Sequence, residues 1–206
     1  MKQVTVPIEV SARHVHLTEA HCKKLFGRGL TRLKLISQTG QFAAVETVTL
    51  KEQGTGNKEQ KSRFKLRVTS YELRDVRVVG PARKESQVEL SLSDCHQLGL
   101  HNVPLKVSGS LAGTPGITVV GPKGKVVLKR GVIVAQRHIH CPTEKARSLG
   151  LKNGQIVRVA VKGKRAVVFE NVVVRVLGDY VFRMHVDTDE ANAAGIDSNS
   201  RGVIIR

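Results

Sequence analysis

Short segments in which apolar and polar residues alternate make up most of the chain. A period of two places successive side chains on opposite faces, which is the pattern of a half-buried β-strand. It predicts strands over residues 4–12, 30–36, 42–50, 64–68, 73–79, 104–107, 117–134, 156–161, 166–177 and 180–186. Tight turns are expected at 162–164 and 178–179, where glycine separates two strand patterns. Because no long helical period interrupts this pattern, a mainly β fold is expected.

Short helices are expected between the strands, and they share a sequence pattern that ends in a glycine followed by an apolar residue. They are expected at residues 18–27, 93–99, 143–151 and 187–196. Thr18 and Ser93 are the expected N-caps of the first two, because a hydroxyl oxygen there accepts from a free backbone N–H. Gly27 and Gly99 are their expected ends. The recurrence indicates two related halves.

Two small closed β-barrels, capped by the short α-helices and related as a pseudo-repeat, fit this order of elements. Closure into a barrel leaves no exposed sheet edge. The halves are expected at residues 1–110 and 111–206, and exchange of strands between them is left open. The polar segment 51–63 lacks apolar periodicity and is expected to be a surface loop.

The charge of the chain predicts anionic partners. The formal net charge is +17 at pH 7 over 206 residues. Nucleic acid is disfavoured, because aromatic residues amount to only 3%, tryptophan is absent, and no helix-turn-helix or zinc-finger spacing occurs. A small molecule with several phosphates would be an equally suitable anionic partner. The other alternative is that the positive side chains contact only solvent and bind no partner.

Cysteine usage and the length of the apolar runs indicate a soluble intracellular protein with no membrane segment. Cys22, Cys95 and Cys141 form an odd set without CxxC spacing, which fits a reducing compartment. The apolar runs fall well short of the roughly 20 residues that cross a bilayer. Met1 leads directly into a strand pattern rather than into a signal peptide.

The phrase Arg-His-apolar-His occurs twice, at residues 13–16 and 137–140. On a strand, the two histidines of each copy share one face. A single strand histidine is usually a buried, hydrogen-bonded side chain, but two copies in matched contexts favour a metal or catalytic role, since imidazole binds zinc, nickel, copper and iron. The candidate ligands are His14, His16, His138 and His140.

Three further side chains extend this candidate site. His185 ends a strand pattern before the fourth helix, and beside His138 and His140 it makes a three-histidine set suited to an open metal position. Glu89 is either an exposed strand carboxylate or a ligand that divalent ions use. Arg83 follows a Gly-Pro turn, and its planar guanidinium matches phosphate oxygens, although by base rate it is a surface arginine.

These residues together resemble a known family. The similar segments are residues 11–17, 80–83, 87–89, 108–110, 114–117 and 136–140. They resemble the PduL-type phosphate propanoyltransferases, the phosphotransacylases associated with bacterial microcompartments and propanediol degradation. The resemblance extends from about Val6 to Ile196.

The resemblance implies two β-barrels with capping helices, a dinuclear zinc site, and reversible transfer of a propanoyl or acetyl group between coenzyme A and inorganic phosphate. It implies direct attack by phosphate on the thioester to form an acyl phosphate, without a protein nucleophile. Arg83 matches the phosphate-binding arginine. One set of implied metal ligands is His14, His16 and Glu89, and the other is His138, His140 and His185.

The resemblance also bears on partners and location. It implies a cytoplasmic enzyme that lies inside a microcompartment with shell or lumen enzymes as partners, and a homo-oligomer is one option. Many members carry an N-terminal segment that directs encapsulation. Here the family-like segment that contains the first histidine phrase begins at Ser11, so no such N-terminal segment is expected before it.

Three alternatives to direct phosphate attack remain open on the sequence. Cys141 follows His140 directly and could act as a nucleophile activated by a neighbouring histidine. A non-catalytic basic module that binds RNA or an acidic partner fits the charge. A metal-dependent thioester hydrolase that uses water fits the histidines.

Overall fold

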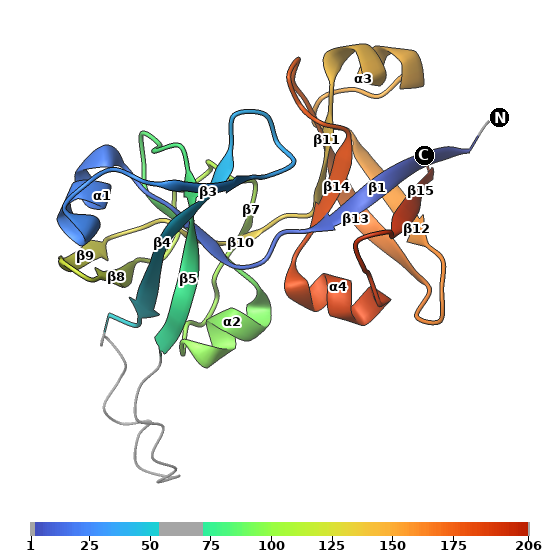
Figure 1. Ribbon diagram of the computed structural model, residues 1–206. Helices are drawn as coiled ribbons and strands as arrows, with labels where there is room; N and C mark the ends of the chain where they lie inside the picture. Colours follow the sequence, from blue (N-terminus) through green and yellow to red (C-terminus); the bar gives the residue numbers. More distant parts are fainter. Residues whose placement is uncertain (1–2, 54–71, 206) are drawn as a thin grey trace, which may run out of the picture. The chain divides into compact units, whose positions relative to one another are not determined.

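The computed structural model describes residues 3–53 and 72–205, and these residues form two compact units (Figure 1). Unit 1 consists of the described parts of Met1–Ala12, Ile36–Gln41 and Ala135–Arg206, and unit 2 of those of Arg13–Leu35 and Phe42–Val134. Each unit has its own hydrophobic core.

The strands of unit 1 form a closed barrel in the order β1-β14-β11-β13-β12-β15. The strands are β1 (Val4–Val10), β11 (His138–Cys141), β12 (Ile156–Val161), β13 (Val167–Val176), β14 (Arg183–Val186) and β15 (Arg201–Ile205). β1 closes the barrel, because it pairs parallel with β14 and antiparallel with β15. Alternate side chains such as Val6, Ile139 and Met184 point inward and form the core.

Unit 2 contains a nine-stranded sheet with the order β7-β10-β6-β2-β5-β4-β8-β9, and β3 pairs with β4 beside this path. The strands are β2 (His14–His16), β3 (Arg32–Leu35), β4 (Phe42–Lys51), β5 (Glu72–Gly80), β6 (Gln87–Leu90), β7 (Leu105–Lys106), β8 (Ile117–Gly121), β9 (Gly124–Leu128) and β10 (Val132–Ala135). Among the described residues this order stays open between β7 and β9. The mainly β class is confirmed, and closure is seen in unit 1.

The two units do not follow the expected ranges 1–110 and 111–206. β1 belongs to the barrel of unit 1, where it lies parallel to β14, while β10 belongs to unit 2, where it lies parallel to β6. Each strand that precedes a histidine phrase is therefore paired with the other half of the chain. Strand pairing, rather than sequence order, sets the division.

Within the described ranges, four short helices follow strands, as expected. They are α1 (Glu19–Phe26), α2 (Leu92–Gln97), α3 (Thr143–Leu149) and α4 (Thr188–Ala194). The Thr18 side chain accepts from the backbone N–H of His21, and Gly27 ends α1 with a φ of 74°. These observations confirm the predicted cap and end of the first helix.

The predicted N-cap of the second helix is wrong, because Ser91 rather than Ser93 occupies that position. The Ser91 hydroxyl accepts from the backbone N–H of Asp94, and the Asp94 carboxylate accepts from the backbone N–H of Ser91. This reciprocal capping box satisfies two helix-end donors at once and fixes the start two residues earlier.

Both histidine phrases occupy equivalent places in their sheets. β2 lies between β5, to which it is parallel, and β6, to which it is antiparallel. β11 lies likewise between the parallel β13 and the antiparallel β14. A pseudo-repeat is thus present at the level of strand pairing.

A few expectations fall outside these elements. The predicted strand 64–68 and most of the predicted loop 51–63 lie outside the described residues. β15 was not anticipated from the sequence pattern. Within the described ranges, no helix has both the length and the apolar character to cross a membrane.

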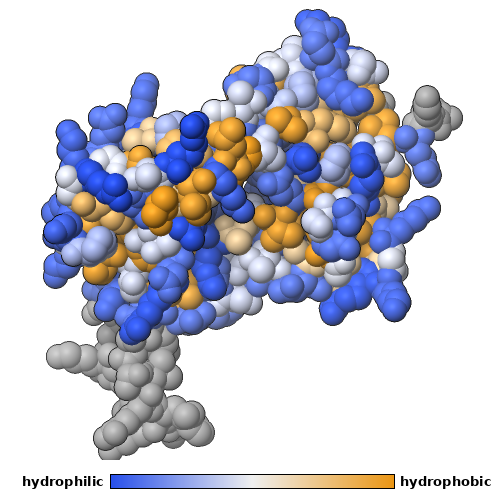
Figure 2. All heavy atoms as spheres, in the orientation of Figure 1, coloured by the Kyte–Doolittle hydropathy of each residue, from blue (hydrophilic) through white to orange (hydrophobic). Residues whose placement is uncertain are grey.

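Hydrophilic side chains cover much of the face in Figure 2. In the described part of the chain every lysine and arginine is at least partly exposed, whereas Glu46, Glu89 and Asp94 are buried. The surplus positive charge is therefore surface charge that an anionic partner can reach.

Candidate metal centres

In unit 2, three potential metal ligands come from two neighbouring strands. His14 on β2 lies directly opposite Glu89 on β6. The Nε2 atoms of His14 and His16 are 3.1 Å apart. Oε1 of Glu89 is 3.6 Å from the first and 3.7 Å from the second. The three side chains that the family resemblance assigns to one metal thus lie together within this unit.

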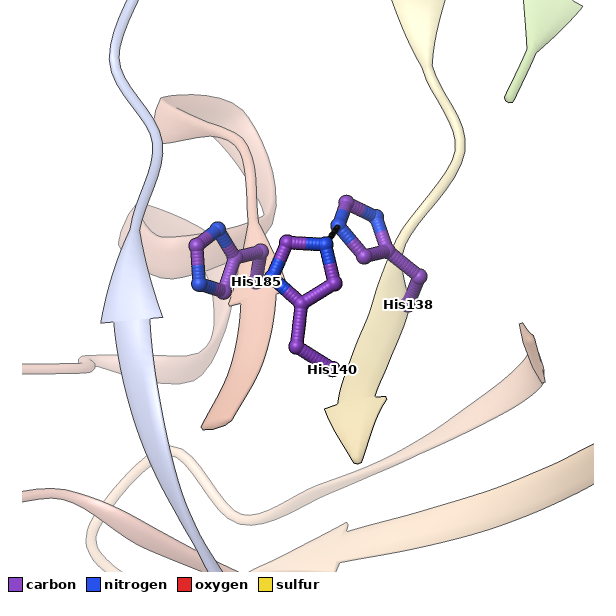
Figure 3. Close-up of side chains that lie close together, drawn as sticks. All are labelled: His138, His140 and His185. Atoms are coloured by element: carbon purple, nitrogen blue, oxygen red, sulfur yellow. Dashed lines mark hydrogen bonds between the residues drawn. The ribbon is translucent and has the colours of Figure 1, made fainter. Parts of the chain in front are cut away.

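In unit 1, the rings of His138 and His140 extend from β11 and that of His185 from β14, so that the three gather in one place (Figure 3). His138 lies directly opposite His185. The Nε2 atoms of His138 and His140 are 3.1 Å apart. The His185 ring centroid lies 5.3 Å from that of His138 and 4.8 Å from that of His140. This second triad repeats the register of the first.

The separations within the unit 2 triad fit a zinc ion. The candidate ligand atoms of each triad lie within 4.8 Å of one another. Atoms that bind a tetrahedral zinc at about 2.0–2.2 Å are about 3.3–3.6 Å apart. In the unit 2 triad the observed separations of 3.1, 3.6 and 3.7 Å match this geometry closely.

Backbone carbonyls determine which ring nitrogen faces each centre. Nδ1 of His16 lies 3.0 Å from the Val79 carbonyl oxygen, and Nδ1 of His138 lies 2.8 Å from that of Gln136. A carbonyl oxygen only accepts, so in the neutral imidazole the proton sits on Nδ1 and the lone pair on Nε2. Such a contact orients a metal-binding histidine.

Electrostatics favour the metal-binding protonation states in unit 2. Burial, together with the nearby His14 and Arg83, lowers the pKa of His16 to about 3, so its ring is neutral. Burial alone raises the pKa of the Glu89 carboxyl, but His14, His16 and the Ser108 hydroxyl outweigh burial and hold that pKa well below its usual range. A neutral imidazole beside an ionised carboxylate is the form that binds a cation.

A hydrogen-bond network links Glu89 to Arg83. The Ser108 hydroxyl donates to Oε1 of Glu89 at 2.7 Å and accepts from Nη1 of Arg83 at 3.3 Å. The Gln87 amide nitrogen donates to Glu89 at 2.5 Å and to Ser108 at 2.9 Å, while its oxygen accepts from the backbone N–H of Gly109 at 2.7 Å. The network orients the carboxylate and places the guanidinium close to it.

The segment that carries Arg83 is tied to the start of α1. The backbone N–H of Arg83 donates to the Leu17 carbonyl at 2.8 Å. The Ser86 hydroxyl accepts from the backbone N–H of Thr18 at 3.0 Å and lies 2.7 Å from Nδ1 of His21. Arg83 is therefore positioned by its backbone as well as by its side chain.

Sequence reasoning missed the roles of three side chains. Gln87 and Ser108 bind the Glu89 carboxylate, and Gln38, which is 3% exposed, lies 3.4 Å from Nε2 of His185. The spacing of two between Gln87 and Glu89 signals a shared strand face. No local pattern connects Ser108 or Gln38 with these centres, because the contacts span 19 and 147 positions.

Cys141 is poorly placed to act as a nucleophile. It is fully buried in the barrel core, whereas its strand neighbour His140 points to the opposite face. Burial raises the pKa of the Cys141 thiol, which disfavours the reactive thiolate. The covalent alternative therefore loses support.

Known proteins provide a decisive comparison. The family described as phosphate propanoyltransferase matches residues 7–197. The chain belongs to this family. A phosphate propanoyltransferase of Sebaldella termitidis is 44% identical over 202 residues, which cover 97% of this chain and 87% of the relative.

Other members of the phosphate propanoyltransferase family give the same result. The relative from Lachnoclostridium phytofermentans is 46% identical over 193 residues, which cover 93% of this chain and 83% of its own. The relative from Salmonella typhimurium is 44% identical over 200 residues, which cover 96% and 87%. Membership in this family makes the chain an acyltransferase and confirms the resemblance seen in the sequence.

Proposed function

We propose that the chain transfers a short acyl group, propanoyl or acetyl, reversibly between coenzyme A and inorganic phosphate, and that it uses two divalent metal ions, expected to be zinc. The observation that carries the proposal is the matched pair of triads in a member of the phosphate propanoyltransferase family. The proposed ligands are His14, His16 and Glu89 for one ion, and His138, His140 and His185 for the other.

Bound divalent ions supply Lewis acidity toward carbonyl and phosphoryl oxygens. The residues of the chain fix where that chemistry takes place. Antiparallel strand pairing sets His14 opposite Glu89 and His138 opposite His185, on strands rather than on loops. Ligands on regular elements need little rearrangement when the substrates arrive.

Arg83 is proposed to bind phosphate. A guanidinium presents parallel N–H donors that match two oxygens of one phosphate. The contact with Ser108 and the backbone bond to Leu17 hold Arg83 near the unit 2 triad. Phosphate held there attacks the thioester carbonyl without an encounter in bulk water, which is the usual benefit of positioning, and the acyl–sulfur bond breaks as the coenzyme A thiolate leaves.

The surface charge supports coenzyme A as the acyl carrier. Coenzyme A carries a diphosphate and a 3′-phosphate, and the chain carries a formal charge of +17. All the described lysines and arginines remain at least partly exposed. A positive surface raises the rate at which an anionic substrate arrives and makes that rate dependent on salt.

The test is phosphate-dependent release of thiol from propanoyl-, acetyl- and butanoyl-CoA, with acyl phosphate trapped as product. Turnover is expected in the wild type and lost in His138→Ala and Arg83→Ala, while His101→Ala, at an exposed position, keeps it. Free acid as the product, with or without phosphate, would instead identify a thioester hydrolase. Salt-dependent RNA binding without turnover would identify a binding module.

Elemental analysis tests the requirement for two metals. The wild type is expected to hold two zinc ions per chain, and Glu89→Gln and His185→Gln are each expected to lose one of them together with turnover. Full turnover by either variant with one ion bound would contradict a two-metal mechanism.

A further inference from the structure

Tyr180 stacks on His140, one of the three histidines of the unit 1 triad. The two ring centroids are 4.1 Å apart, and the ring planes differ by 23°. Such a stack covers a face of the imidazole, whereas both nitrogens lie on its edge. A metal ion binds a nitrogen lone pair in the plane of the ring. The tyrosine can therefore hold His140 without competing with an ion for it.

His140 is the member of the triad whose orientation affects both of the others. Its ring centroid lies 4.6 Å from that of His138 and 4.8 Å from that of His185, whereas those two centroids are 5.3 Å apart. Figure 3 shows the His140 ring between the other two. A rotation of this imidazole would therefore change its distances to both of the other candidate ligands.

The turn between β13 and β14 carries Tyr180, and backbone hydrogen bonds fix this turn beside β11. The backbone N–H of Leu177 donates to the carbonyl of Cys141, the residue after His140, at 3.2 Å, and that of Tyr180 donates to the Leu177 carbonyl at 3.3 Å. The Arg175 guanidinium lies 6.0 Å from the Tyr180 ring centroid, and Arg175 is paired with His140 in the sheet. These contacts keep the tyrosine ring next to the triad.

The segment 36–41, which also belongs to unit 1, holds the same turn. The Thr39 hydroxyl donates to the Asp179 carbonyl at 2.8 Å. The Gln38 side-chain oxygen accepts from the backbone N–H of Val181 at 3.3 Å, and its nitrogen donates to the Val181 carbonyl at 3.5 Å. Both neighbours of Tyr180 are thus tied down, so its ring loses little further freedom when it stacks.

We propose that Tyr180 is a positioning residue of the unit 1 metal centre, and that its ring holds the His140 imidazole in the orientation that binds the ion. The inference rests on the proposed function, in which this triad holds one of two divalent ions. A ligand that is already oriented gives up less rotational freedom when the ion binds, so the stack raises the affinity. The effect requires a flat aromatic ring and not the tyrosine hydroxyl.

Proton NMR spectra of the zinc-free protein test the stack itself. The ring current of Tyr180 shields protons that lie over its face, so the His140 ring protons are expected upfield of their position in the unfolded chain. This upfield shift is expected to persist in Tyr180→Phe and to be lost in Tyr180→Leu. The ring protons of His101, at an exposed position, are the internal control and are expected to keep their resonances in both variants.

Zinc affinity measures the effect of the stack on the centre. Chelator competition is carried out in the Glu89→Gln background, in which only the unit 1 triad keeps all three ligands. Tyr180→Leu is expected to weaken zinc binding about three- to tenfold, the contribution of one aromatic stack, and Tyr180→Phe is expected to restore it. Phe182→Leu is the matched control, because Phe182 packs against the barrel core and contacts Lys145, and it is expected to leave the affinity unchanged.

Thr39→Val tests the same proposal without altering any aromatic ring. It removes the hydroxyl that holds the turn at Asp179, and it lies at an exposed position, so it is not expected to impair folding. Zinc binding is expected to weaken about twofold, the effect of one exposed hydrogen bond. This variant decides the question if Tyr180→Leu does not fold.

Unchanged zinc affinity in Thr39→Val and in folded Tyr180→Leu would overturn the proposal. So would an equal loss in Phe182→Leu, or a loss in Tyr180→Phe as large as that in Tyr180→Leu. The proposed function fails separately. A protein whose zinc affinity depends on Tyr180 but which shows no phosphate-dependent release of thiol would keep this role for Tyr180 and lose the transferase. Normal turnover with two ions bound, together with a zinc affinity independent of Tyr180, would do the reverse.

Discussion

Arg137 donates from Nη1 to Oε1 of Glu190 at 2.6 Å. This contact connects β11, the strand that carries two histidines of the unit 1 triad, to α4, the helix that follows the third histidine. Glu190 also accepts from the backbone N–H of Asp187, the N-cap of α4. His185 lies two residues before that cap. In unit 2, Arg13 forms the corresponding ion pair with Asp94 of the α2 capping box. The arginine of each phrase therefore has a structural role.

Arg137→Met is expected to destabilise the zinc-free protein by about 1–2 kcal/mol, the cost of a partly buried, charge-assisted hydrogen bond after allowance for solvent. Urea unfolding measures this loss. Arg147→Met is the control, since its ion pair with Glu144 is exposed and is expected to contribute less than about 0.5 kcal/mol. If the two substitutions lowered the free energy of unfolding equally, the ion pair of Arg137 would contribute no more to stability than an exposed one.

Gln87→Met is expected to weaken zinc binding about 10- to 100-fold, because it removes the amide that orients the Glu89 carboxylate. Competition with a chelator measures the affinity. Gln97→Met, at the exposed end of α2, is expected to leave the affinity unchanged. Wild-type affinity in Gln87→Met would mean that Ser108 alone is enough to orient Glu89.

Arg83→Lys is expected to raise KM for phosphate by about tenfold or more and to leave KM for acyl-CoA nearly unchanged. Lysine keeps the charge but lacks the planar pair of donors, and charge-assisted bonds contribute about 1.5–3 kcal/mol. Arg130→Lys, in an exposed ion pair with Glu85, is the matched control. A proportional change in both KM values would argue against a phosphate-specific role.

Acidification is expected to destabilise the zinc-free protein. Burial lowers the pKa of His16 to about 3 in the folded state, whereas the unfolded chain takes up this proton near pH 6.5. Below pH 6.5 the unfolded state therefore binds more protons, and the loss from His16 reaches about 2 kcal/mol at pH 5. The lowered pKa of Glu89 adds to the loss below its usual range near 4.5.

Urea unfolding at pH 7 and pH 5 measures whether the free energy of unfolding falls on acidification. His16→Gln is expected to reduce the difference in unfolding free energy between the two pH values. The control His101→Gln, at an exposed position, is expected to keep it. A difference that persists in His16→Gln would locate the proton uptake elsewhere.

Cys141→Ala is expected to retain turnover within about twofold, since the thiol is buried in the barrel core and its raised pKa disfavours the thiolate. A moderate loss of stability is expected from the smaller side chain. Loss of turnover in folded, zinc-replete Cys141→Ala protein would restore the acyl-cysteine route.

The sequence by itself determined the local elements and the candidate side chains. Alternation located most strands because it reports which side chains face a core, and Thr18 and Gly27 set the limits of α1 because caps act locally. The two histidine phrases indicated His14 and His138, each with the second histidine of its phrase, as candidate ligands. Family membership confirms the resemblance. These signals need no knowledge of distant contacts.

Only the tertiary structure decided how these elements pair. Register places Glu89 opposite His14 and His185 opposite His138, and β1 and β10 pair with strands far away in the sequence. Ser108 and Gln38 acquire their contacts in the same way. Strand pairing joins backbone groups that are remote along the chain, and its register depends on the whole sheet, so no local pattern could fix it.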